Sequence, residues 1–387
     1  MAPEPPDHDI VIVGGGPVGS ALALGLAAAE RSVLLIDATT EAGSDDPRTL
    51  ALSYGSRLIL ERLAVWGAIT PTTDIRTIHI SQRGAFGSTV LTASEAQAPA
   101  LGYVVPFSAV QRALKVSMQR VPRLHVVRDA RANHIEEQPD RLLVTFEYDG
   151  RSRTVSTALL VIADGGTLAR QLARVKVHEY EQSAVVCNVT TSKPHTYTAF
   201  ERFTEDGPLA LLPRENGYAV IWTVAPERAP QLCSATPAAF IEQLQSAFGT
   251  RAGRFLSVHD RATFPLALRL ASDAQADRVV LIGNAAQALH PVAGQGLNLC
   301  LRDAWELASL LCATEGDAGA QSVVHGFQRA RQRDRRSSVL LTDAMVRAFS
   351  NRNLALQWLR GCGLTFLDCL PPAKQSFMRQ MIFGALW

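Results

Sequence analysis

Residues 9–37 read DIVIVGGGPVGSALALGLAAAERSVLLID, and this stretch decides the fold. The apolar run 9–13 predicts a buried strand, and three consecutive glycines follow it. Residues 18–30 then predict a helix, and the apolar run 32–36 predicts a second strand that ends at Asp37. A strand, a glycine turn, a helix and a strand in this order form a βαβ unit, which indicates an α/β fold with a parallel sheet.

The glycines of this unit have the spacing of a dinucleotide-binding turn, Gly14-x-Gly16-x-x-Gly19. Gly14 permits the tight turn, Gly16 lets the backbone approach a pyrophosphate, and Gly19 lets the helix pack closely on the strand. A carboxylate at Asp37 accepts hydrogen bonds from ribose hydroxyls and repels a 2′-phosphate, which favours FAD or NAD over NADP. The alternative is a glycine turn without a ligand, because this motif by itself is a weak signal.

Two further glycine-marked segments accompany this turn. VIADGG at 161–166 places Asp164 at the carboxyl end of a predicted strand, and LIGNAAQALHPVAGQGLNLCLRD at 281–303 contains a loop with little side-chain bulk, on which a flat ring can lie. The helix expected from about Gly296 to Cys312 would point its positive end at that ring and stabilise the negative charge of a reduced flavin. Together the three segments predict one cofactor site.

Two polar residues of the last segment are candidates for specific contacts. Asn284 ends the strand predicted over 278–282, where a short polar side chain can bond a ribityl hydroxyl. His290 is a candidate acid or base near the flavin. A histidine before proline is more often a hydrogen-bonded loop residue, so both interpretations stay open.

The rest of the chain alternates short strands with turn signals. The segments RLHVV, HIEEQPDRLLVTFEYDG and TALLVIADGG within 121–166 predict a β-meander that returns to the main sheet. Residues 184–263 predict a second, mostly antiparallel sheet, which would form a substrate wall.

The composition excludes several classes of protein. The 387 residues are 47% hydrophobic and 19% charged, with a net charge of +2, which suits a soluble globular protein and gives nucleic acid no basic surface. The six cysteines form no C-x-x-C pair and no histidine cluster has metal-ligand spacing, which predicts a reducing compartment and no metal. The apolar run 10–29 follows an acidic, proline-rich segment, so we expect neither export nor a membrane span and predict a cytoplasmic protein.

With these segments in view, the chain resembles the class A FAD-dependent aromatic monooxygenases of the para-hydroxybenzoate hydroxylase fold, and within them the ubiquinone-biosynthesis hydroxylases. GNAAQALHPVAGQGLN at 283–298 is most similar to the 2-polyprenyl-6-methoxyphenol hydroxylase branch. The resemblance covers nearly the whole chain. The other stretches that carry it are RTLALS at 48–53, IHISQRGAFG at 78–87, FERFTEDGPLALLP at 200–213 and RQRDRRSSVLLTDAMVRAFSN at 331–351.

The resemblance implies a Rossmann-like FAD-binding domain interwoven with an antiparallel-sheet substrate domain. The FAD-binding domain would comprise residues 1–75, 101–180 and 275–350, and the substrate domain residues 76–100 and 181–274. Residues 351–387 would form a C-terminal helical tail.

The resemblance also implies the contacts to FAD. Asn284 would take the ribityl contact, Arg48 would approach the flavin and pyrophosphate, and Asp164 would belong to the family's DG motif. The family usually has a serine where this chain has Leu168, and Arg170 comes early, which puts contacts to pyrophosphate or NAD(P)H in doubt. The residues expected at the ADP half are Gly14, Gly16, Pro17, Gly19 and Asp37, and those expected to edge the isoalloxazine are Pro291, Gly294, Gln295, Gly296, Leu297 and Asn298.

The reaction implied is hydroxylation of the ring of a polyprenylated phenol in ubiquinone biosynthesis. NAD(P)H would reduce FAD, O2 would add at the flavin C4a, and the hydroperoxide would deliver oxygen to the ring. No general base stands out in the sequence. The alternatives are another flavin-dependent oxidoreductase on the same fold, or a non-catalytic subunit of a biosynthetic assembly that FAD stabilises.

The C-terminal segment 354–387 is rich in apolar residues, among them Trp358, Leu359, Phe366, Phe377 and Trp387. Charged residues interrupt them too often for a transmembrane span. One hypothesis is peripheral attachment to the inner membrane or to other ubiquinone-biosynthesis proteins, because the substrate partitions into lipid. The alternative is that these residues pack on the FAD-binding domain as a closing helix.

Overall fold

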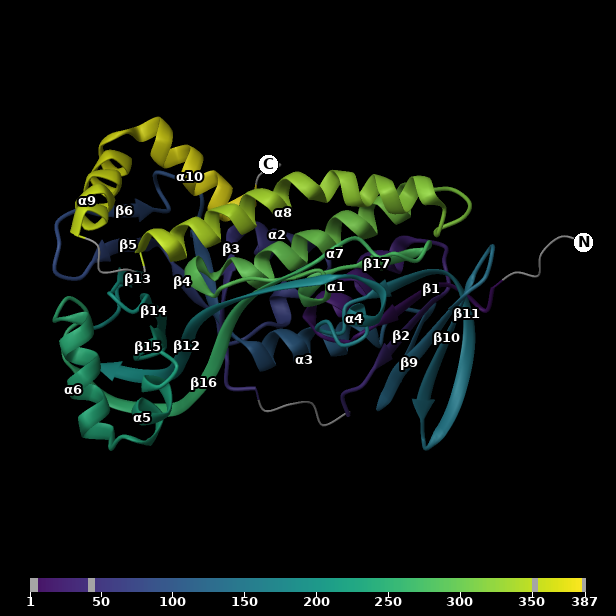
Figure 1. Cartoon of the computed structure of the whole chain (residues 1–387), viewed down its shortest axis with the longest axis horizontal. Helices are drawn as coiled ribbons and strands as arrows, with labels where there is room; N and C mark the ends of the chain where they lie inside the picture. The colour runs from purple at the N-terminus through teal and green to yellow at the C-terminus, as the bar shows by residue number, and fades with distance from the viewer. Residues whose placement is uncertain (1–5, 41–45, 350–353, 385–387) are drawn as a thin grey trace, which may run out of the picture.

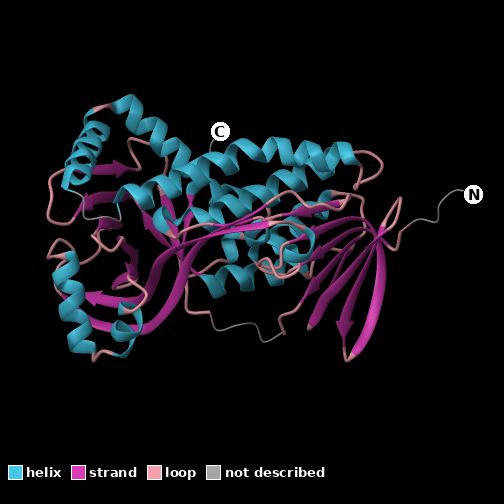
Figure 2. Ribbon diagram, viewed as in Figure 1, coloured by secondary structure: helices cyan, strands magenta, loops and turns pink. Residues whose placement is uncertain are grey.

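The structure is a computed structural model that describes residues 6–40, 46–349 and 354–384. Two large sheets lie at opposite ends of an elongated molecule, with long helices running between them (Figure 1). Figure 2 shows the strands of one sheet fanning out at the end where the chain begins, and those of the other beneath the C-terminal helices.

The first sheet contains the predicted βαβ unit. It has seven strands in the order β8-β2-β1-β11-β10-β9, with β17 beside β11. All neighbouring pairs are parallel except those that β10 makes with β9 and β11. The strands are β1 (His8–Val13), β2 (Val33–Asp37), β8 (Leu124–Arg128), β9 (Ala130–Glu137), β10 (Leu142–Tyr148), β11 (Arg151–Ile162) and β17 (Val279–Leu281).

Successive side chains of β1 point to opposite faces of the first sheet and so belong to two separate apolar clusters. Ile10 and Ile12 pack against the helices α1 (Pro17–Gly25) and α7 (Gln295–Ala313), whereas Val11 and Val13 face the side of the β9–β11 meander. Both faces are therefore buried, which explains why this strand is a continuous apolar run. The other helices of this end are α2 (Tyr54–Arg62), α3 (Phe107–Met118), α4 (Ala169–Leu172) and α8 (Gln321–Phe349), with 3₁₀ turns η1 (Leu26–Ala28), η2 (Trp66–Ala68), η3 (Gly283–Ala285) and η4 (Val292–Gly294).

A buried ion network holds α8 across α7. Arg331 donates to Asp303 and to Asp334, each at 2.7 Å, and Arg302 donates to Asp334 at 2.8 Å. These four side chains are at most 5% exposed. Removing one of these four side chains would leave a buried charge unpaired. The network therefore fixes how the two helices pack.

The second sheet is mostly antiparallel, as expected. Its eight strands follow the order β18-β16-β12-β15-β14-β13-β5-β6, and β13 pairs with β5 in parallel. The helices α5 (Arg228–Ser234) and α6 (Pro237–Phe248) lie at this end, and Phe240 and Phe248 of α6 share an apolar cluster with Trp222 of the sheet. The strands are β5 (Thr77–Gln82), β6 (Ser88–Thr92), β12 (Val175–Thr191), β13 (Thr198–Phe203), β14 (Pro208–Arg214), β15 (Gly217–Val224), β16 (Phe255–Ala271) and β18 (Gln287–Ala288).

A small third sheet and two C-terminal helices complete the fold. The third sheet has the order β3-β7-β4, with β3 (Thr49–Ser53), β7 (Gly102–Pro106) and β4 (Thr73–Ile75). The helix α9 (Leu354–Cys369) packs on β5 and β6, and α10 (Pro371–Phe383) packs on α2. Across the described ranges, no helix is both long and apolar enough to cross a membrane.

One expected element lies elsewhere. The segment RLHVV was predicted as part of the meander, but the structure places it in β8, parallel to β2 at the edge of the first sheet. The chain reaches β8 from helix α3, and a strand that follows a crossover helix pairs in parallel. The meander consists of β9, β10 and β11 only, among the described strands.

Candidate functional site

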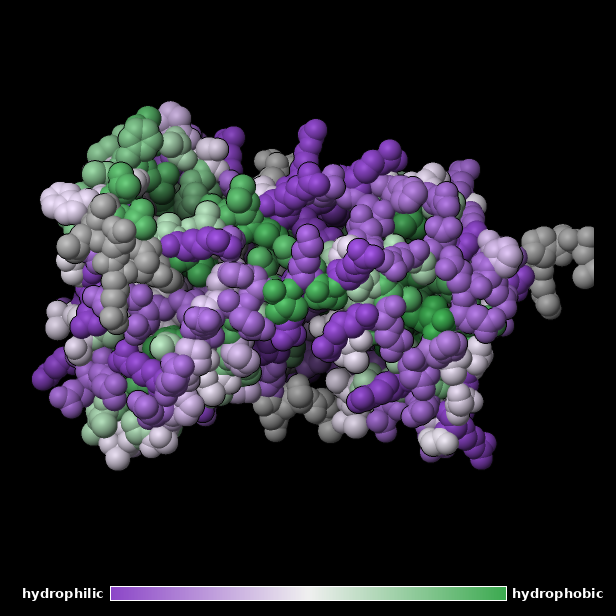
Figure 3. Space-filling view, viewed as in Figure 1, coloured by the Kyte–Doolittle hydropathy of each residue, from purple (hydrophilic) through white to green (hydrophobic). Residues whose placement is uncertain are grey.

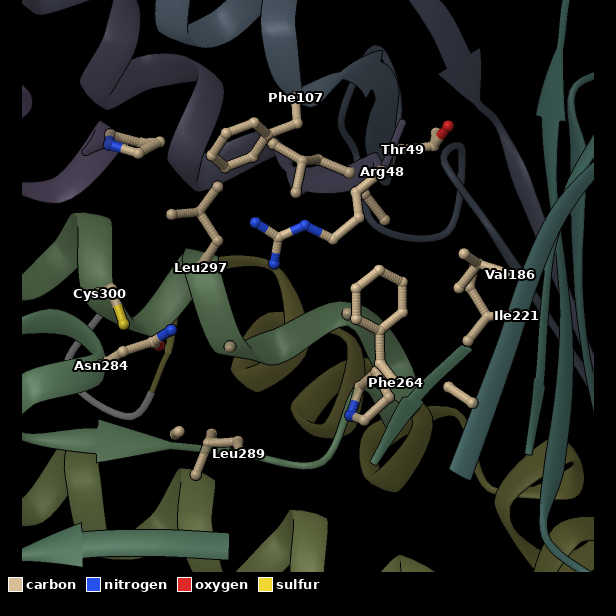
Figure 4. A pocket seen from close by; sticks show the side chains of 18 of the residues that line it. Arg48, Thr49, Phe107, Val186, Ile221, Phe264, Asn284, Leu289, Leu297 and Cys300 are labelled. Carbon is tan, nitrogen blue, oxygen red and sulfur yellow. The ribbon is translucent and has the colours of Figure 1, made fainter. Parts of the chain in front are cut away.

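A cavity of about 1140 Å³ lies between the two large sheets. Most small-molecule sites enclose roughly 300–1,000 Å³, so this cavity suits a large ligand or two ligands together. All three glycine-marked segments contribute to its wall, with Gly16, Asp164 and Gly296 among the lining residues. Figure 4 shows the part of the cavity between Asn284 and Phe264.

In the first glycine turn, Gly14 is closely packed against its neighbours, whereas Gly16 is open to the cavity. Gly14 has a φ of +111°, and a Cβ there would lie 2.5 Å from the carbonyl oxygen of Ala163. A Cβ at Gly16, in contrast, would meet no atom within 4 Å, since this residue faces the cavity. Gly16 is the N-cap of α1, Pro17 follows it, and no side chain caps the helix. An anionic group can therefore approach the backbone at the start of α1.

Asp37 lies beside this turn at the end of β2. Its carboxylate accepts hydrogen bonds from the Thr39 amide at 3.2 Å and from the Thr39 hydroxyl at 2.6 Å. The side chain packs so closely on Gly15 that a Cβ at residue 15 would overlap it. Asp37 is 5% exposed and lines the cavity, so its position is fixed before any ligand binds.

Asp164 forms a compact turn after β11. It accepts hydrogen bonds from the backbone N–H of Gly166 at 2.8 Å and of Leu168 at 2.6 Å. Leu168 occupies the position where the related motif has serine, and its side chain is buried at 2% exposure. Arg170 donates to the carbonyl of Gly166 at 3.2 Å. The Asp164 carboxylate thus holds the turn through two backbone N–H groups, and no serine hydroxyl takes part.

The loop before α7 contributes backbone more than side chains. Pro291, Gly294, Gly296 and Leu297 line the cavity, and so does Asn284. Gly294 has a φ of +62° and is the N-cap of α7, which starts at Gln295, one residue from the expected start. A Cβ at Gly296 would meet no atom within 4 Å, so a second helix N-terminus is open to the cavity.

Two residues predicted to edge the flavin point into the protein. Gln295 donates to the carbonyl of Met381 at 3.2 Å. Asn298 accepts from the Ser53 amide at 2.8 Å and from the Ser56 hydroxyl at 2.7 Å, and it donates to the carbonyls of Ala51 and Gly294. Neither side chain belongs to the cavity wall. Their hydrogen bonds hold the loop in place on the side that faces away from the cavity.

His290 is buried at 0% exposure, outside the cavity wall. Its Nδ1 accepts a hydrogen bond from the Val292 amide at 3.1 Å, and its ring lies edge-on to Tyr180, with centroids 5.3 Å apart. Burial lowers the pKa of His290 to about 4, so the imidazole is neutral at physiological pH. This geometry supports the interpretation as a loop residue.

Arg48 lies directly before β3 and extends its side chain into the cavity, as Figure 4 shows. Its guanidinium pairs with Asp46 at 2.6 Å and lies 4.8 Å from the centre of the Phe107 ring. A cation at this point can meet an anionic part of a ligand, which agrees with the contact expected for Arg48.

The cavity continues into an apolar part over the second sheet. Val186, Ile221 and Phe264 form the wall there (Figure 4). The two C-terminal helices close it with Leu364 and Leu367 from α9 and with Phe377 and Met381 from α10. The alternative expected from the sequence was packing on the FAD-binding domain. The helix α10 packs on α2, near the first sheet, whereas α9 packs on β5 and β6 of the second sheet.

Sequence reasoning missed Glu201, a carboxyl group within this apolar wall. The signal was present in the alternation AFERF of β13, where Ala199, Glu201 and Phe203 share one face of the strand. The sequence does not reveal that this face turns to the cavity.

The cavity suits FAD on two observations of the described residues. Gly16 and Gly296 each leave an open space where any other residue would place a Cβ, and each lies at the N-terminus of a helix. One such cradle suits a pyrophosphate and the other suits a flat, electron-rich ring, which are the two halves of FAD.

Comparison with known families agrees with this geometry. Residues 7–339 match the family described as FAD binding domain. The chain is 32% identical over 389 residues to ubiquinone hydroxylase UbiL of Rhodospirillum rubrum, covering 96% of this chain and 88% of the relative. It is 31% identical over 378 residues to the 3-demethoxyubiquinol 3-hydroxylase of Escherichia coli, covering 92% and 93%.

Solved structures share the fold at low sequence identity. The p-nitrophenol 4-monooxygenase PnpA of Pseudomonas putida superposes with a TM-score of 0.80 at 17% identity, covering 98% of this chain and 99% of that one. The protein pqsL of Pseudomonas aeruginosa gives a TM-score of 0.76 at 18% identity, covering 93% of this chain and 99% of that one. The predicted fold class and the FAD cofactor are thereby confirmed. The chain belongs to the FAD-binding domain family of FAD-dependent monooxygenases, with the para-hydroxybenzoate hydroxylase-like fold.

Proposed function

We propose that this chain hydroxylates the ring of a polyprenylated phenol in ubiquinone biosynthesis, with FAD as cofactor, NAD(P)H as electron donor and O2 as co-substrate. The observation that carries this proposal is the two-part cavity. Its glycine-lined end suits FAD, and its apolar end beside Val186, Ile221 and Phe264 suits a phenol with a long apolar chain. The names of the relatives from Rhodospirillum rubrum and Escherichia coli support the same substrate class.

In this proposal the FAD contacts follow the three glycine-marked segments. When bound, FAD supplies the activation of O2 after reduction by NAD(P)H, and the protein supplies position, dryness and electrostatics. The positive end of α7 would stabilise negative charge on a flavin ring held beside Gly296. Gln295 and Asn298 act by holding the loop through their hydrogen bonds. The direct contacts that we assign are Gly14, Gly16, Pro17, Asp37, Arg48, Asp164, Asn284, Pro291, Gly294, Gly296 and Leu297.

We also retain the division of the chain expected from the sequence. Residues 1–75, 101–180 and 275–350 would form the FAD-binding domain, residues 76–100 and 181–274 the substrate domain, and residues 351–387 the tail. The cavity between the two sheets would then lie at the domain boundary, which is a common place for a ligand site.

Deleting this chain from its own cells tests the proposal. The quinone precursor lacking one ring oxygen should accumulate, and mass spectrometry of a lipid extract identifies it. A plasmid copy of the chain should restore the normal quinone. If precursor and quinone levels stay unchanged in the deletion, and no related hydroxylase is present, the proposed substrate class is wrong. If the purified protein binds FAD but NAD(P)H never reduces it, the role of a non-catalytic subunit is favoured.

We further propose that the tail attaches the enzyme to a lipid surface. Trp358, Leu359 and Phe366 of α9 are 66%, 66% and 60% exposed, and the ring of Phe86 lies 4.8 Å from that of Trp358. Figure 3 shows hydrophobic side chains gathered over α9 and α10. Contiguous exposed apolar residues mark an interaction surface.

The opposite face of α9 supports this proposal. Leu364 is 7% exposed, and Leu364 and Leu367 line the apolar end of the cavity. One helix thus presents apolar residues both outward and to the substrate space. A substrate that partitions into lipid could pass from the bilayer to the cavity beside this helix, without its chain crossing water.

A further inference from the structure

A carboxyl group lies within the apolar wall of the cavity. Glu201 is on β13, directly opposite Ile80 of β5 and Ala210 of β14, so its nearest cross-strand neighbours are apolar. Ala199 and Phe203 lie on the same face of β13 and also line the cavity. The adjacent residue Arg202 points to the other side of the sheet.

Among the described residues, the Oε1 atom of Glu201 is buried and has no hydrogen-bond partner. Glu201 as a residue is only partly buried, because it faces the cavity. A buried carboxyl oxygen without a partner is costly, and proteins seldom keep one in an apolar wall without a use. This burial raises the pKa of Glu201 to about 8. Perturbed carboxyl groups that face a ligand cavity are frequent at functional sites.

The charged groups on neighbouring elements are engaged elsewhere. Tyr180 of β12 donates to Asp343 of α8 at 3.2 Å, and Asp343 pairs with Arg347 at 2.8 Å. Arg360 of α9 donates to the carbonyl of Leu356 at 3.0 Å.

On the other side of the sheet, His79 of β5 lies near Arg202 and Arg251, and Arg83 lies near Arg202. Removal of the carboxyl of Glu201 from water is the cause of its raised pKa, and no neighbouring charge offsets it. The carboxyl is therefore free to interact with a ligand in the cavity.

We propose that Glu201 is the general base that takes the hydroxyl proton of the bound phenol while the ring is hydroxylated. This assignment rests on the proposed function, because it requires a phenolic substrate. The O–H bond of the phenol breaks, and the proton forms a new O–H bond at the Glu201 carboxylate. The electron pair left on the phenol oxygen moves into the ring and makes an ortho or para carbon nucleophilic toward the oxygen atom derived from O2.

The proton balance closes within the turnover. When the ring becomes aromatic again, the hydroxylated carbon releases its hydrogen as a proton to the second oxygen atom of O2, and the phenol oxygen takes a proton back from Glu201. The carboxylate is then ready for the next substrate. The second atom of O2 leaves as water, with both electrons supplied by NAD(P)H.

The acidity of Glu201 suits this role. A phenol has a pKa of about 10 and an ordinary glutamate one of about 4.3, a gap of roughly six units. The raised value for Glu201 narrows the gap to about two units, within which a positioned base can share the proton. The carboxylate form is required, so product formation should increase with pH through about 8.

The test compares Glu201→Gln with the wild-type holoenzyme on a short-chain 2-prenylphenol. Glu201→Gln keeps the shape but cannot take a proton. We expect FAD content and flavin reduction by NAD(P)H to remain normal, while the yield of hydroxylated product falls by about 10²-fold or more and H2O2 replaces it. The pH dependence near 8 should disappear. Glu136→Gln, on the exposed face of β9, is the matched control. Wild-type product yield and an unchanged pH profile in Glu201→Gln would overturn the assignment.

A binding measurement tests the role of Glu201 independently of the proposed hydroxylation reaction. 4-Nitrophenol is more acidic than an ordinary phenol, and only its anion is coloured. When 4-nitrophenol binds to the wild-type holoenzyme, its hydroxyl should lose its proton to Glu201. In Glu201→Leu the ionisation should move to higher pH by about one unit or more, because an anion in an apolar wall loses its partner. Identical ionisation in both proteins would overturn the assignment. If the shift occurs but the wild type hydroxylates no prenylphenol, the assignment of Glu201 stands and the proposed reaction is wrong.

Discussion

The Cα of Gly19 packs directly against the carbonyl oxygen of Gly14, so that a Cβ at residue 19 would overlap this oxygen. This contact joins the first turn of α1 to the end of β1. Gly16, between them, has open space in place of such a contact. Two glycines of one motif therefore have separable roles, one in folding and one in ligand approach.

This separation predicts different outcomes for two matched substitutions. Gly16→Val should fold but yield colourless protein, because the branched side chain would occupy the space proposed for the pyrophosphate. Gly19→Val should lower the yield of folded protein, since its side chain has no space. The flavin absorbance and the thermal midpoint of each purified variant measure the two effects. Stoichiometric FAD in Gly16→Val would show that the motif is misassigned.

Gly296 and Gly294 form a second pair, at the start of α7. Gly296→Leu meets no protein atom at Cβ, so the Tm of the FAD-free form should change little, while FAD occupancy or hydroxylation drops sharply. Gly294→Leu places a side chain at a φ of +62° and should cost about 1–3 kcal/mol in unfolding free energy. Normal activity and FAD content in Gly296→Leu would mean that the flavin ring lies elsewhere.

His290 should make stability depend on pH. Its pKa of about 4 in the folded protein lies below the value of about 6.5 in an unfolded chain. Between these values the unfolded chain binds a proton that the folded protein does not, so stability is present above about pH 6.5 and decreases as the pH falls toward 4. The loss amounts to about 3 kcal/mol at most.

The variant His290→Asn checks this prediction. Asparagine can still accept the hydrogen bond from Val292 but cannot take a proton. Urea unfolding at pH 7 and at pH 4.5 should show a smaller loss of stability in the variant than in the wild type. Equal losses would mean that His290 is not the titrating group.

The exposed face of α9 predicts lipid binding that surface substitutions abolish. Replacing Trp358 and Leu359 together by glutamate should weaken sedimentation with phospholipid vesicles by at least about tenfold, because two large apolar side chains lose their burial in lipid. FAD content should not change, since neither side chain lines the cavity. Leu256→Glu, an exposed leucine of β16, is the control. Equal sedimentation of variant and wild type would contradict membrane attachment through this face.

Much of the fold could be predicted from local sequence patterns. The glycine turn, the strand before Asp164 and the start of α7 each depend on residues within a short segment, so period and turn chemistry identify them. The orientation of Gln295 and Asn298 could not be predicted. Their side chains bond to Met381 and to Ser53, which are distant in sequence, and the same residues in a bare loop would face solvent or ligand equally well.

The residues at the substrate end of the cavity were still harder to predict, because their positions depend on the tertiary structure. Alternation in β13 groups Glu201 with Ala199 and Phe203, but either face of a strand can be the buried one. The same limit applies to predicting the C-terminal helices from the sequence. Their apolar content was evident, whereas the division into a cavity face with Leu367 and an outer face with Trp358 follows from how α9 packs on β5 and β6.

The most direct test of the account is the mass of the product formed by purified, FAD-loaded enzyme under ¹⁸O₂ with NAD(P)H and a short-chain 2-prenylphenol. We predict a ring-hydroxylated product that carries one ¹⁸O atom, formed in proportion to the NAD(P)H consumed. Consumption of NAD(P)H with H2O2 as the only product, for this phenol and for the precursor that accumulates in cells lacking the chain, would contradict it.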